Sequence, residues 1–294
     1  MDFPFTGVIA VDKPRGISSR RVVDAVTRAL SMRAVGHAGT LDPLASGVMI
    51  VCVGHATKLV DHLHLLPKHY SASFLLGRSS PSDDFETPIE VEENPPQPSR
   101  DEVEGAAGAF RGEILQRPCD YSAVHVDGKR AYRLARKGRT LELEAKRVRI
   151  ESLVITDYQW PRLAVDVVCS SGTYIRALGR DLAESLGTRA VMESLVRSAV
   201  GPFTLGECVA LEALDRDTAP GHLRPPLVAA AHLPRIDLDA LQLALAVRGG
   251  LLQFDMPAGV EHFAAVGPTG ELVGILKIHS SGAFRLRPNF FGLG

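Results

Sequence analysis

Apolar residues are spaced along this chain in two ways that predict β-strands. Residues 7–11 and 47–54 are short, β-branched apolar runs between glycines, which is typical of strands buried on both faces. Apolar and polar residues alternate over 69–76, 148–158 and 163–169, as expected when only one face of a strand is buried. The chain is therefore predicted to contain a substantial sheet.

Two other segments, residues 18–30 and 174–186, show helical spacing, because their apolar residues recur every three or four positions. Gly187 follows the second segment at a position typical of a C-cap. Strands outnumber helices and do not alternate strictly with them. This pattern favours an α+β fold with a mixed or antiparallel sheet over a doubly wound parallel sheet.

The composition changes near the C-terminus. Residues 214–234 are rich in Pro, Gly and Ala and are predicted to form a linker. Residues 235–294 contain a helical pattern at 238–247 and a strand pattern at 271–278. We expect a large domain over 1–234 and a small β-rich module over 235–294, which at this size is expected to dock on the larger domain.

The 294 residues have the composition of a soluble globular protein, with 45% hydrophobic and 23% charged residues. This composition excludes intrinsic disorder, and no apolar run approaches the ~20 residues of a membrane span. The N-terminus shows no secretory-signal pattern. The four cysteines form no CxxC pair, so we expect free thiols and a cytoplasmic protein.

Charge is unevenly distributed although the net charge is only −1. Residues 13–33 hold six basic residues and one acid, and residues 117–149 hold ten basic and four acidic residues. Between them, the Pro-rich stretch 81–105 holds nine acids and one base. The two basic stretches suit a polyanion bound on part of the surface, although two solvated helix faces and an acidic surface loop would give the same counts.

The segment GHAGTLDPLASG at residues 36–47 stands out, because three glycines, a proline and a threonine surround one carboxylate, Asp42. Taken alone it also fits an ordinary Asp-Pro turn whose carboxylate caps the backbone. With the preceding DKPRGISS, however, it closely resembles the bacterial tRNA pseudouridine-55 synthases of the TruB type. The resemblance covers about residues 7 to 210 in the right order, through GHATK at 54–58, KHY at 68–70, YSA at 121–123, GKRAY at 128–132 and CSSGTYIR at 169–176.

The resemblance implies a pseudouridine-synthase catalytic domain followed by a PUA-like module that binds RNA. Such enzymes break the N1–C1′ bond of one uridine in the T-loop of tRNA, at position 55, and rejoin the base through C5. This isomerisation implies no cofactor and no metal. His62 and His64, a close histidine pair on a predicted helix, have no Cys or carboxylate nearby to complete a ligand set, so we interpret them as surface or packing residues.

Three residues match the family's catalytic positions. Asp42 is the catalytic carboxylate, acting either as a nucleophile at C1′ or in support of a glycal route. Arg176 would keep it ionised, and its place in the first turn of a predicted helix is unfavourable for a cation unless an anion is adjacent. Tyr70 would stack on the uracil close to C5, although an alternating strand would also place a tyrosine there for cross-strand packing.

Other matches concern substrate binding. Tyr174 would line the pocket, and Leu195 would either line it or pack in the core. His37 would contact the T-loop and help hold the target base out of the stack. The basic stretch 117–149 corresponds to an insertion that closes over the T-arm, so that Lys129, Arg130 and Arg133, with Lys13 from the first stretch, are expected to meet phosphates.

Two other functions remain possible. A guide-RNA-dependent pseudouridine synthase shares the catalytic core, but this chain lacks the Lys-rich tails and larger C-terminal region of many such proteins. A non-catalytic tRNA-binding or tRNA-folding protein would not need Asp42, Tyr70 and Arg176 together. We expect a monomer, because no amphipathic segment is left unassigned.

Overall fold

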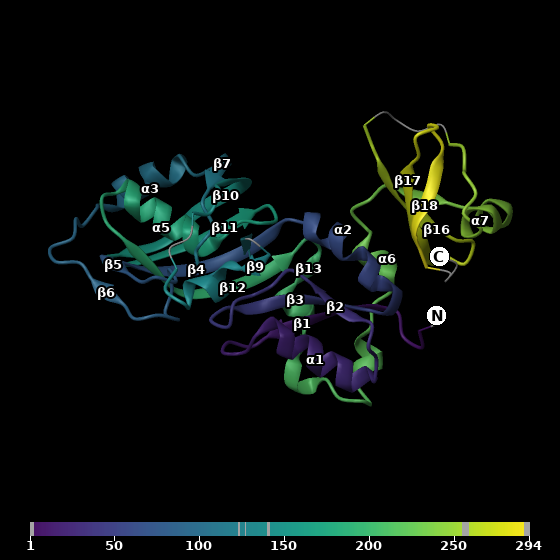
Figure 1. Cartoon of the computed structure of the whole chain (residues 1–294), viewed down its shortest axis with the longest axis horizontal. Helices are drawn as coiled ribbons and strands as arrows, with labels where there is room; N and C mark the ends of the chain where they lie inside the picture. Colours follow the sequence, from purple (N-terminus) through teal and green to yellow (C-terminus); the bar gives the residue numbers. More distant parts are fainter. Residues whose placement is uncertain (1–2, 123, 127, 140–141, 255–258, 291–294) are drawn as a thin grey trace.

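The computed structural model describes residues 3–122, 124–126, 128–139, 142–254 and 259–290. Most of the strands belong to one large mixed sheet, which runs in the order β14-β1-β3-β12-β4-β11-β10-β7 (Figure 1). Within the described residues its strands are β1 Gly7–Lys13, β2 Val35–Ala38, β3 Ser46–Val53, β4 Lys68–Leu76, β7 Gly112–Gln116, β10 Lys146–Gln159, β11 Arg162–Cys169, β12 Ala190–Val200, β13 Phe203–Thr204 and β14 Val209–Ala210.

The sheet is antiparallel except where β1 pairs with β14 and β12 pairs with β3. The parallel contact between β12 and β3 is short and joins the two halves of the sheet. The predicted α+β class with a mixed sheet is thus confirmed. All five strand patterns in the sequence fall on strands of this sheet.

Helices cover both halves of the sheet. Helix α1 (Ser19–Leu30) packs on one face of β1 and β3, and α2 (Val60–Leu65) packs on the other. Helices α3 (Arg100–Gly108) and α5 (Ile175–Ser185) cover β4, β10, β11 and β12. Ser18 and Tyr174 are the N-cap residues of α1 and α5, so both predicted helices begin within one residue of the expected position.

Close packing fixes the placement of α5. A Cβ atom on Gly179 would lie 2.0 Å from Cε1 of Phe74, so the helix can approach β4 only because glycine has no side chain there. Gly187 follows the helix with φ +76°, the left-handed conformation predicted for the C-cap region. This packing sets the position of the first turn of α5, which carries Arg176.

The C-terminal residues form a separate four-stranded sheet in the order β15-β16-β17-β18, beside helix α7 (Ala240–Val247). This module docks on the larger part of the chain, as predicted. Ala264, Leu272 and Ile275 share an apolar cluster with residues of β1 and β3, and the Nζ of Lys58 donates to the carbonyl of Asn289 at 2.8 Å. The strands are β15 Arg235–Asp237, β16 His262–Val266, β17 Leu272–Ile278 and β18 Phe284–Asn289.

The predicted linker, residues 214–234, is instead packed against the main sheet. Ala219, Ala229 and Ala230 are fully buried, and the last two lie in or beside the short helix α6 (Pro226–Ala229). Val8 of β1 exchanges main-chain hydrogen bonds with Arg224, at 3.0 and 2.8 Å. Small residues let this segment lie close to the sheet, so its Pro, Gly and Ala content reflects close packing and not a flexible linker.

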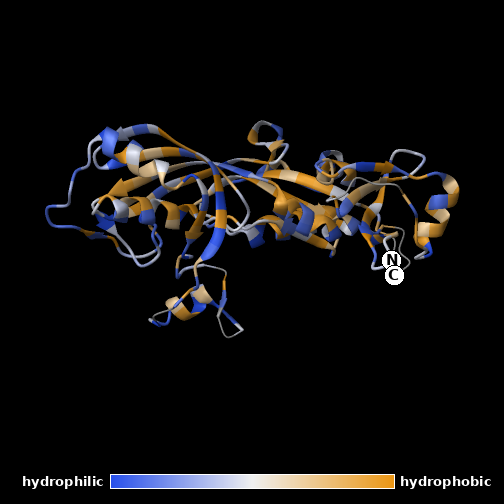
Figure 2. Ribbon diagram, turned by 90° about the horizontal axis from the view of Figure 1, so that it is seen from above, coloured by the Kyte–Doolittle hydropathy of each residue, from blue (hydrophilic) through white to orange (hydrophobic). Residues whose placement is uncertain are grey.

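The basic stretch 117–149 is also divided differently from the prediction. Its last residues, from Lys146 onward, belong to β10 of the main sheet. The middle forms a small arm that stands out from one face of the sheet (Figure 2). The arm consists of strand β8 His125–Val126, strand β9 Lys129–Arg130 and helix α4 Ala131–Ala135, held by a small apolar cluster that includes Leu134 and Leu143.

Candidate active site

A cavity of about 260 Å³ opens where the loop between β2 and β3 meets β4, β12 and the start of α5. Asp42, Tyr70, Tyr174, Arg176 and Leu195 all line it, so the structure brings five of the sequence-predicted residues together. The other lining residues are Gly39, Thr40, Leu41, His64, Lys68, Ser122, Ser170, Ser171, Gly172, Thr173, Ile175 and Arg197.

The loop that carries Asp42 is fixed by main-chain hydrogen bonds on both sides. The N–H of Leu41 donates to the hydroxyl of Ser19 at 2.8 Å, and this hydroxyl donates to the carbonyl of Leu41 at the same distance. The N–H of Gly16 donates to Pro43 at 2.7 Å. Because the residues on both sides of Asp42 are held, its side chain projects into the cavity from a rigid support.

Gly47, just after this loop, has a conformation and a position that only glycine tolerates. Its φ is +104°, and a Cβ atom would lie 2.3 Å from the main-chain oxygen of Arg197 on β12. Gly16 has a similar φ of +91° but open space around it. Substituting each glycine by alanine therefore distinguishes the free-energy cost of backbone strain, which both positions share, from the cost of a steric clash, which arises only at Gly47.

We expect Gly47→Ala to lower the free energy of unfolding by more than Gly16→Ala does. Strain alone should cost Gly16→Ala about 1 kcal/mol, whereas the added clash should bring Gly47→Ala to about 3 kcal/mol or more. Urea unfolding of both variants measures the difference. Equal losses would show that β3 and β12 separate easily at this point.

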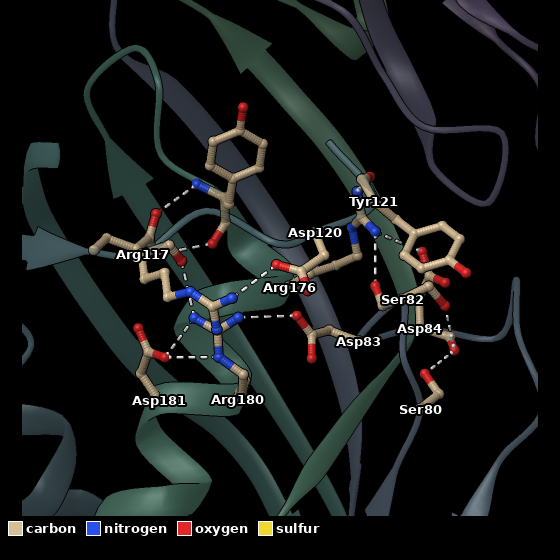
Figure 3. A network of polar contacts seen from close by, with 12 residues as sticks. Ser80, Ser82, Asp83, Asp84, Arg117, Asp120, Tyr121, Arg176, Arg180 and Asp181 are labelled. Carbon is tan, nitrogen blue, oxygen red and sulfur yellow. Dashed lines mark hydrogen bonds and ion pairs between the residues drawn. The ribbon is translucent and has the colours of Figure 1, made fainter. Parts of the chain in front are cut away.

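Arg176 connects Asp42 to a second, buried carboxylate. Its Nη2 lies 3.0 Å from Oδ2 of Asp42, and its Nη1 lies 3.3 Å from Oδ2 of Asp84. The guanidinium also donates to the carbonyls of Ser82 at 2.7 Å and Tyr121 at 2.9 Å (Figure 3). Its hydrogen bonds and both anions fix the fork of this arginine, which is only 4% exposed.

The environment of Asp42 both opposes and supports its ionisation. Enclosure by the cavity walls raises the pKa of Asp42, although 38% of its side chain is still exposed, and the guanidinium of Arg176 counters this rise. The nearby Asp84 raises the pKa of Asp42 further. The cavity therefore holds a carboxylate whose charge depends on one buried arginine.

Asp83 and Asp84 come from the acidic stretch that the sequence predicts to be a surface loop. Both are instead held close to the cavity. The N–H of Met192 at the start of β12 donates to the carbonyl of Asp83 at 2.9 Å, and Asp83 also pairs with Arg180 at 3.1 Å. Figure 3 shows this second ion pair beside Arg176. Part of the acidic stretch thus stabilises the site instead of facing solvent.

Tyr174 is held by its main chain at the start of α5. Its N–H donates to Oε1 of the buried Gln116 at 2.8 Å, and its carbonyl accepts from Nε2 of Gln116 at 3.1 Å. Burial raises the pKa of its phenol. Leu195 is 7% exposed, lines the cavity and belongs to the apolar core, so the two alternatives for this residue are both correct.

His37 lies on β2 beside the cavity rather than in its wall. Its ring is half-buried, and burial lowers its pKa, with smaller contributions from Arg197 and His64. His64, which the sequence suggests to be a surface or packing residue, instead lines the cavity. His62 does pack, against the ring of His262 with 5.2 Å between the ring centroids.

Lys13 does not lie where the sequence analysis places it. It is fully buried, and its Nζ donates to the carbonyls of Pro14 at 3.0 Å and Ile17 at 2.7 Å. Burial lowers its pKa to about 8, and the charge of Asp42 opposes this shift. Lys13 therefore holds the segment under the catalytic loop, and the expected phosphate contact is wrong for this residue.

Lys129, Arg130 and Arg133 are exposed on the arm, as a phosphate-binding surface requires. The guanidinium of Arg133 stacks on the ring of Tyr132, with 5.9 Å to its centroid, so part of this basic surface is pre-ordered.

Sequence reasoning missed several residues of the site. Asp84, Gln116 and Arg197 act through contacts between segments far apart in the chain, and no local pattern marks Asp84 or Gln116. A signal existed only for Arg197, because it is a lone cation in the apolar strand pattern of β12. Among the described residues, no group of His, Cys, Asp and Glu side chains could hold a metal ion, and no helix is long and apolar enough to cross a membrane.

Comparison with known protein families shows which family has this sequence. Residues 27–175 match the model of the TruB family pseudouridylate synthase (N terminal domain). The tRNA pseudouridine synthase B of Mycobacterium sp. (strain KMS) is 40% identical over 277 residues, which are 92% of this chain and 92% of the relative. The chain belongs to the TruB family of pseudouridylate synthases.

Other TruB relatives and solved structures agree. The tRNA pseudouridine synthase B of Streptomyces avermitilis is 36% identical over 283 residues, which are 92% of this chain and 93% of the relative. The structure of a Cbf5-Nop10-Gar1 complex matches with a TM-score of 0.74 and 23% identity, over 97% of this chain and 84% of that one. This likeness confirms the pseudouridine-synthase fold.

Proposed function

We propose that the protein isomerises the uridine at position 55, in the T-loop of tRNA, to pseudouridine. The observation that carries this proposal is the ion pair of 3.0 Å between Asp42 and Arg176. This pair lies in a cavity that Tyr70 and Tyr174 also line, and the chain is a member of the TruB family. The relatives named tRNA pseudouridine synthase B support tRNA as the substrate.

In this proposal Asp42 either bonds to C1′ or removes the proton from C2′ to form a glycal, and the bond between N1 and C1′ breaks. The base then turns and C5 bonds to C1′, as the bond between Asp42 and C1′ breaks or as C2′ regains its proton. The C5 proton then leaves and N1 gains a proton. Arg176 favours the ionised form of Asp42 before the reaction, and four contacts fix this arginine in place before substrate binds. The two tyrosines supply flat surfaces on which an extruded uracil can stack.

The proposal includes how the tRNA is bound. We propose that the T-stem-loop lies between the cavity and the basic arm, with His37 beside the extruded base. The catalytic domain would comprise residues 1–234, and residues 235–294 would form a PUA-like module that contacts the tRNA farther from the site. We propose that the enzyme acts as a cytoplasmic monomer.

Purified protein and unmodified tRNA transcript, without any other component, test the proposal. We expect one pseudouridine at position 55, and none in a transcript in which that uridine is replaced by cytidine. Conversion that requires an added guide RNA would favour the guide-dependent alternative. Tight binding without any conversion would favour the non-catalytic tRNA-binding alternative.

The arm gives a separate prediction about affinity. Replacing Lys129, Arg130 and Arg133 by Ala should weaken binding of all tRNAs alike and flatten the salt dependence, because phosphate contacts do not read bases. Each lost contact removes a log–log slope of about 0.7 to 0.9, so the total change is about two units. Binding isotherms at several salt concentrations measure this.

The matched control replaces three exposed arginines outside both basic stretches, Arg100, Arg189 and Arg216, by Ala. It removes the same charge and should change the slope much less. Equal effects of the two triple variants would show that overall charge, and not the arm, attracts the RNA.

A further inference from the structure

Lys68 is a buried cation in the wall of the cavity, and the reaction described above gives it no role. It begins β4, two residues before Tyr70, so the two side chains lie on the same face of the strand. Lys68 is 5% exposed, and its Nζ donates to the carbonyls of His64 at 2.5 Å and Leu66 at 2.6 Å. An ammonium has three N–H groups, and the third of Lys68 has no acceptor among the residues that the structure describes.

No anion balances the charge of Lys68. Arg176 pairs with two carboxylates, whereas Lys68 forms no ion pair within the described part of the chain. A second cation of the cavity wall, Arg197, is 1% exposed and donates to three main-chain carbonyls. The nearby Cys169 supplies no charge, because burial raises the pKa of its thiol to about 11. Buried lysines are rarely left without an anionic partner, so we expect negative charge in the cavity at some stage of the reaction.

Lys68 remains a cation near neutral pH despite its burial. Burial lowers its pKa to about 8, and the charge of Arg197 contributes to this shift. The ammonium is therefore the major form at pH 7, and an anion in the cavity would raise the pKa of Lys68 again. The positive charge is thus in place before substrate binds.

We propose that Lys68 stabilises the negative charge that the uracil carries after its bond to C1′ breaks. This inference rests on the proposed isomerase function. The electron pair of the N1–C1′ bond stays with the base, so negative charge spreads over N1, O2 and O4 until C5 bonds to C1′. The uracil of the bound tRNA is neutral, so Lys68 gains its counter-ion only as the bond breaks. An interaction of this kind lowers the barrier without tightening substrate binding.

Stacking of the uracil on aromatic rings is compatible with this role. A base that stacks on Tyr70 or Tyr174 contacts the ring with its flat face, and N1, O2 and O4 lie along its edge. The edge then faces the remaining wall of the cavity, to which Lys68 belongs.

Two other roles of Lys68 have to be separated from this one. Its Nζ holds carbonyls at the end of α2, and a lysine at this position can simply cap the helix. A phosphate of the tRNA is the other anion that an ammonium would bind.

Transcripts with two different bases at position 55 separate the three roles. Wild-type protein and Lys68→Met convert transcripts that carry uridine or 5-fluorouridine there, in single turnovers at saturating tRNA. Fluorine withdraws electrons, so the detached 5-fluorouracil anion needs less stabilisation by the protein. We expect Lys68→Met to lower the rate about 100-fold with uridine and less than about 10-fold with 5-fluorouridine. The dissociation constant and its salt dependence should change little.

Loss of the starting nucleoside, counted after digestion of the RNA, measures both rates, because it does not depend on departure of the C5 proton. The matched control is Lys13→Met. Lys13 is also a buried lysine whose Nζ donates to two carbonyls, but it does not line the cavity. Its loss should lower both rates by the same factor. If Lys68→Met does not fold, Lys68→Gln replaces it, since glutamine keeps N–H donors without a charge.

Equal rate losses with the two bases would overturn the proposal and leave Lys68 a cap of α2. Weaker binding with a flatter salt dependence and an unchanged rate would also overturn it, and would assign Lys68 to a phosphate. An unchanged rate and affinity would overturn it as well. Wild-type protein that forms no pseudouridine would contradict the proposed function itself, and this outcome is read separately from the comparison of variants.

Discussion

Asp42→Asn is expected to abolish pseudouridine formation while tRNA binding persists. The amide keeps the shape of the side chain and can still contact Arg176, but it is neither a nucleophile nor a base. We expect the single-turnover rate to fall by at least about 10⁴-fold and the dissociation constant to change by less than about threefold. Pseudouridine mapping and filter binding on the same tRNA measure the two effects.

Asp166→Asn is a matched control for this substitution. Asp166 is an exposed carboxylate on β11 that accepts a hydrogen bond from Ser71 at 2.6 Å, on the same sheet but outside the cavity lining. It should leave both rate and affinity unchanged. Appreciable turnover by Asp42→Asn would show that another group carries the reaction.

Arg176→Met should lower the rate about 100-fold or more, with a much smaller loss of affinity. The substitution leaves Asp84 buried without its partner and removes the cation that offsets the desolvation of Asp42, an effect of about 3 kcal/mol or more. Arg176→Lys keeps the charge but cannot reach both carboxylates and both carbonyls, so its rate should lie between those of Arg176→Met and the wild type.

The pH–rate profile of Arg176→Met should also shift, in a direction that follows from the charge of Arg176. Arg176 favours the ionised form of Asp42, so its removal should raise the pKa of that carboxyl further. The acidic limb of the pH–rate profile should then move to higher pH, and part of the activity should return as the pH rises. An unmoved acidic limb, or a loss confined to binding, would contradict the pairing.

The pairing of Asp42 with Arg176 could be predicted from sequence because two local signals agreed. Asp42 lies in a glycine-rich loop that matches the family, and a cation in the first turn of α5 requires an anion nearby. Five strands of the main sheet and both long helices could be predicted for a similar reason, since hydrophobic periodicity reports directly which face of an element is buried.

Asp84 and Lys13 could not be predicted, because their roles depend on contacts that no local pattern encodes. A run of acids and prolines indicates exposure on average, yet Asp84 is buried because its segment pairs with the start of β12. Counting charges placed Lys13 on the surface, whereas its side chain folds back onto the carbonyls of Pro14 and Ile17. Charge counts do not report burial.

Release of tritium from C5 of the target uridine tests the central claim most directly, because only the isomerisation replaces that hydrogen. Transcripts labelled with tritium at C5 of uridine are mixed with excess enzyme, and tritium in the solvent is counted over time. The account predicts one equivalent released per tRNA by the wild-type protein and none by Asp42→Asn. No release by the wild-type protein, or equal release by both, would contradict it.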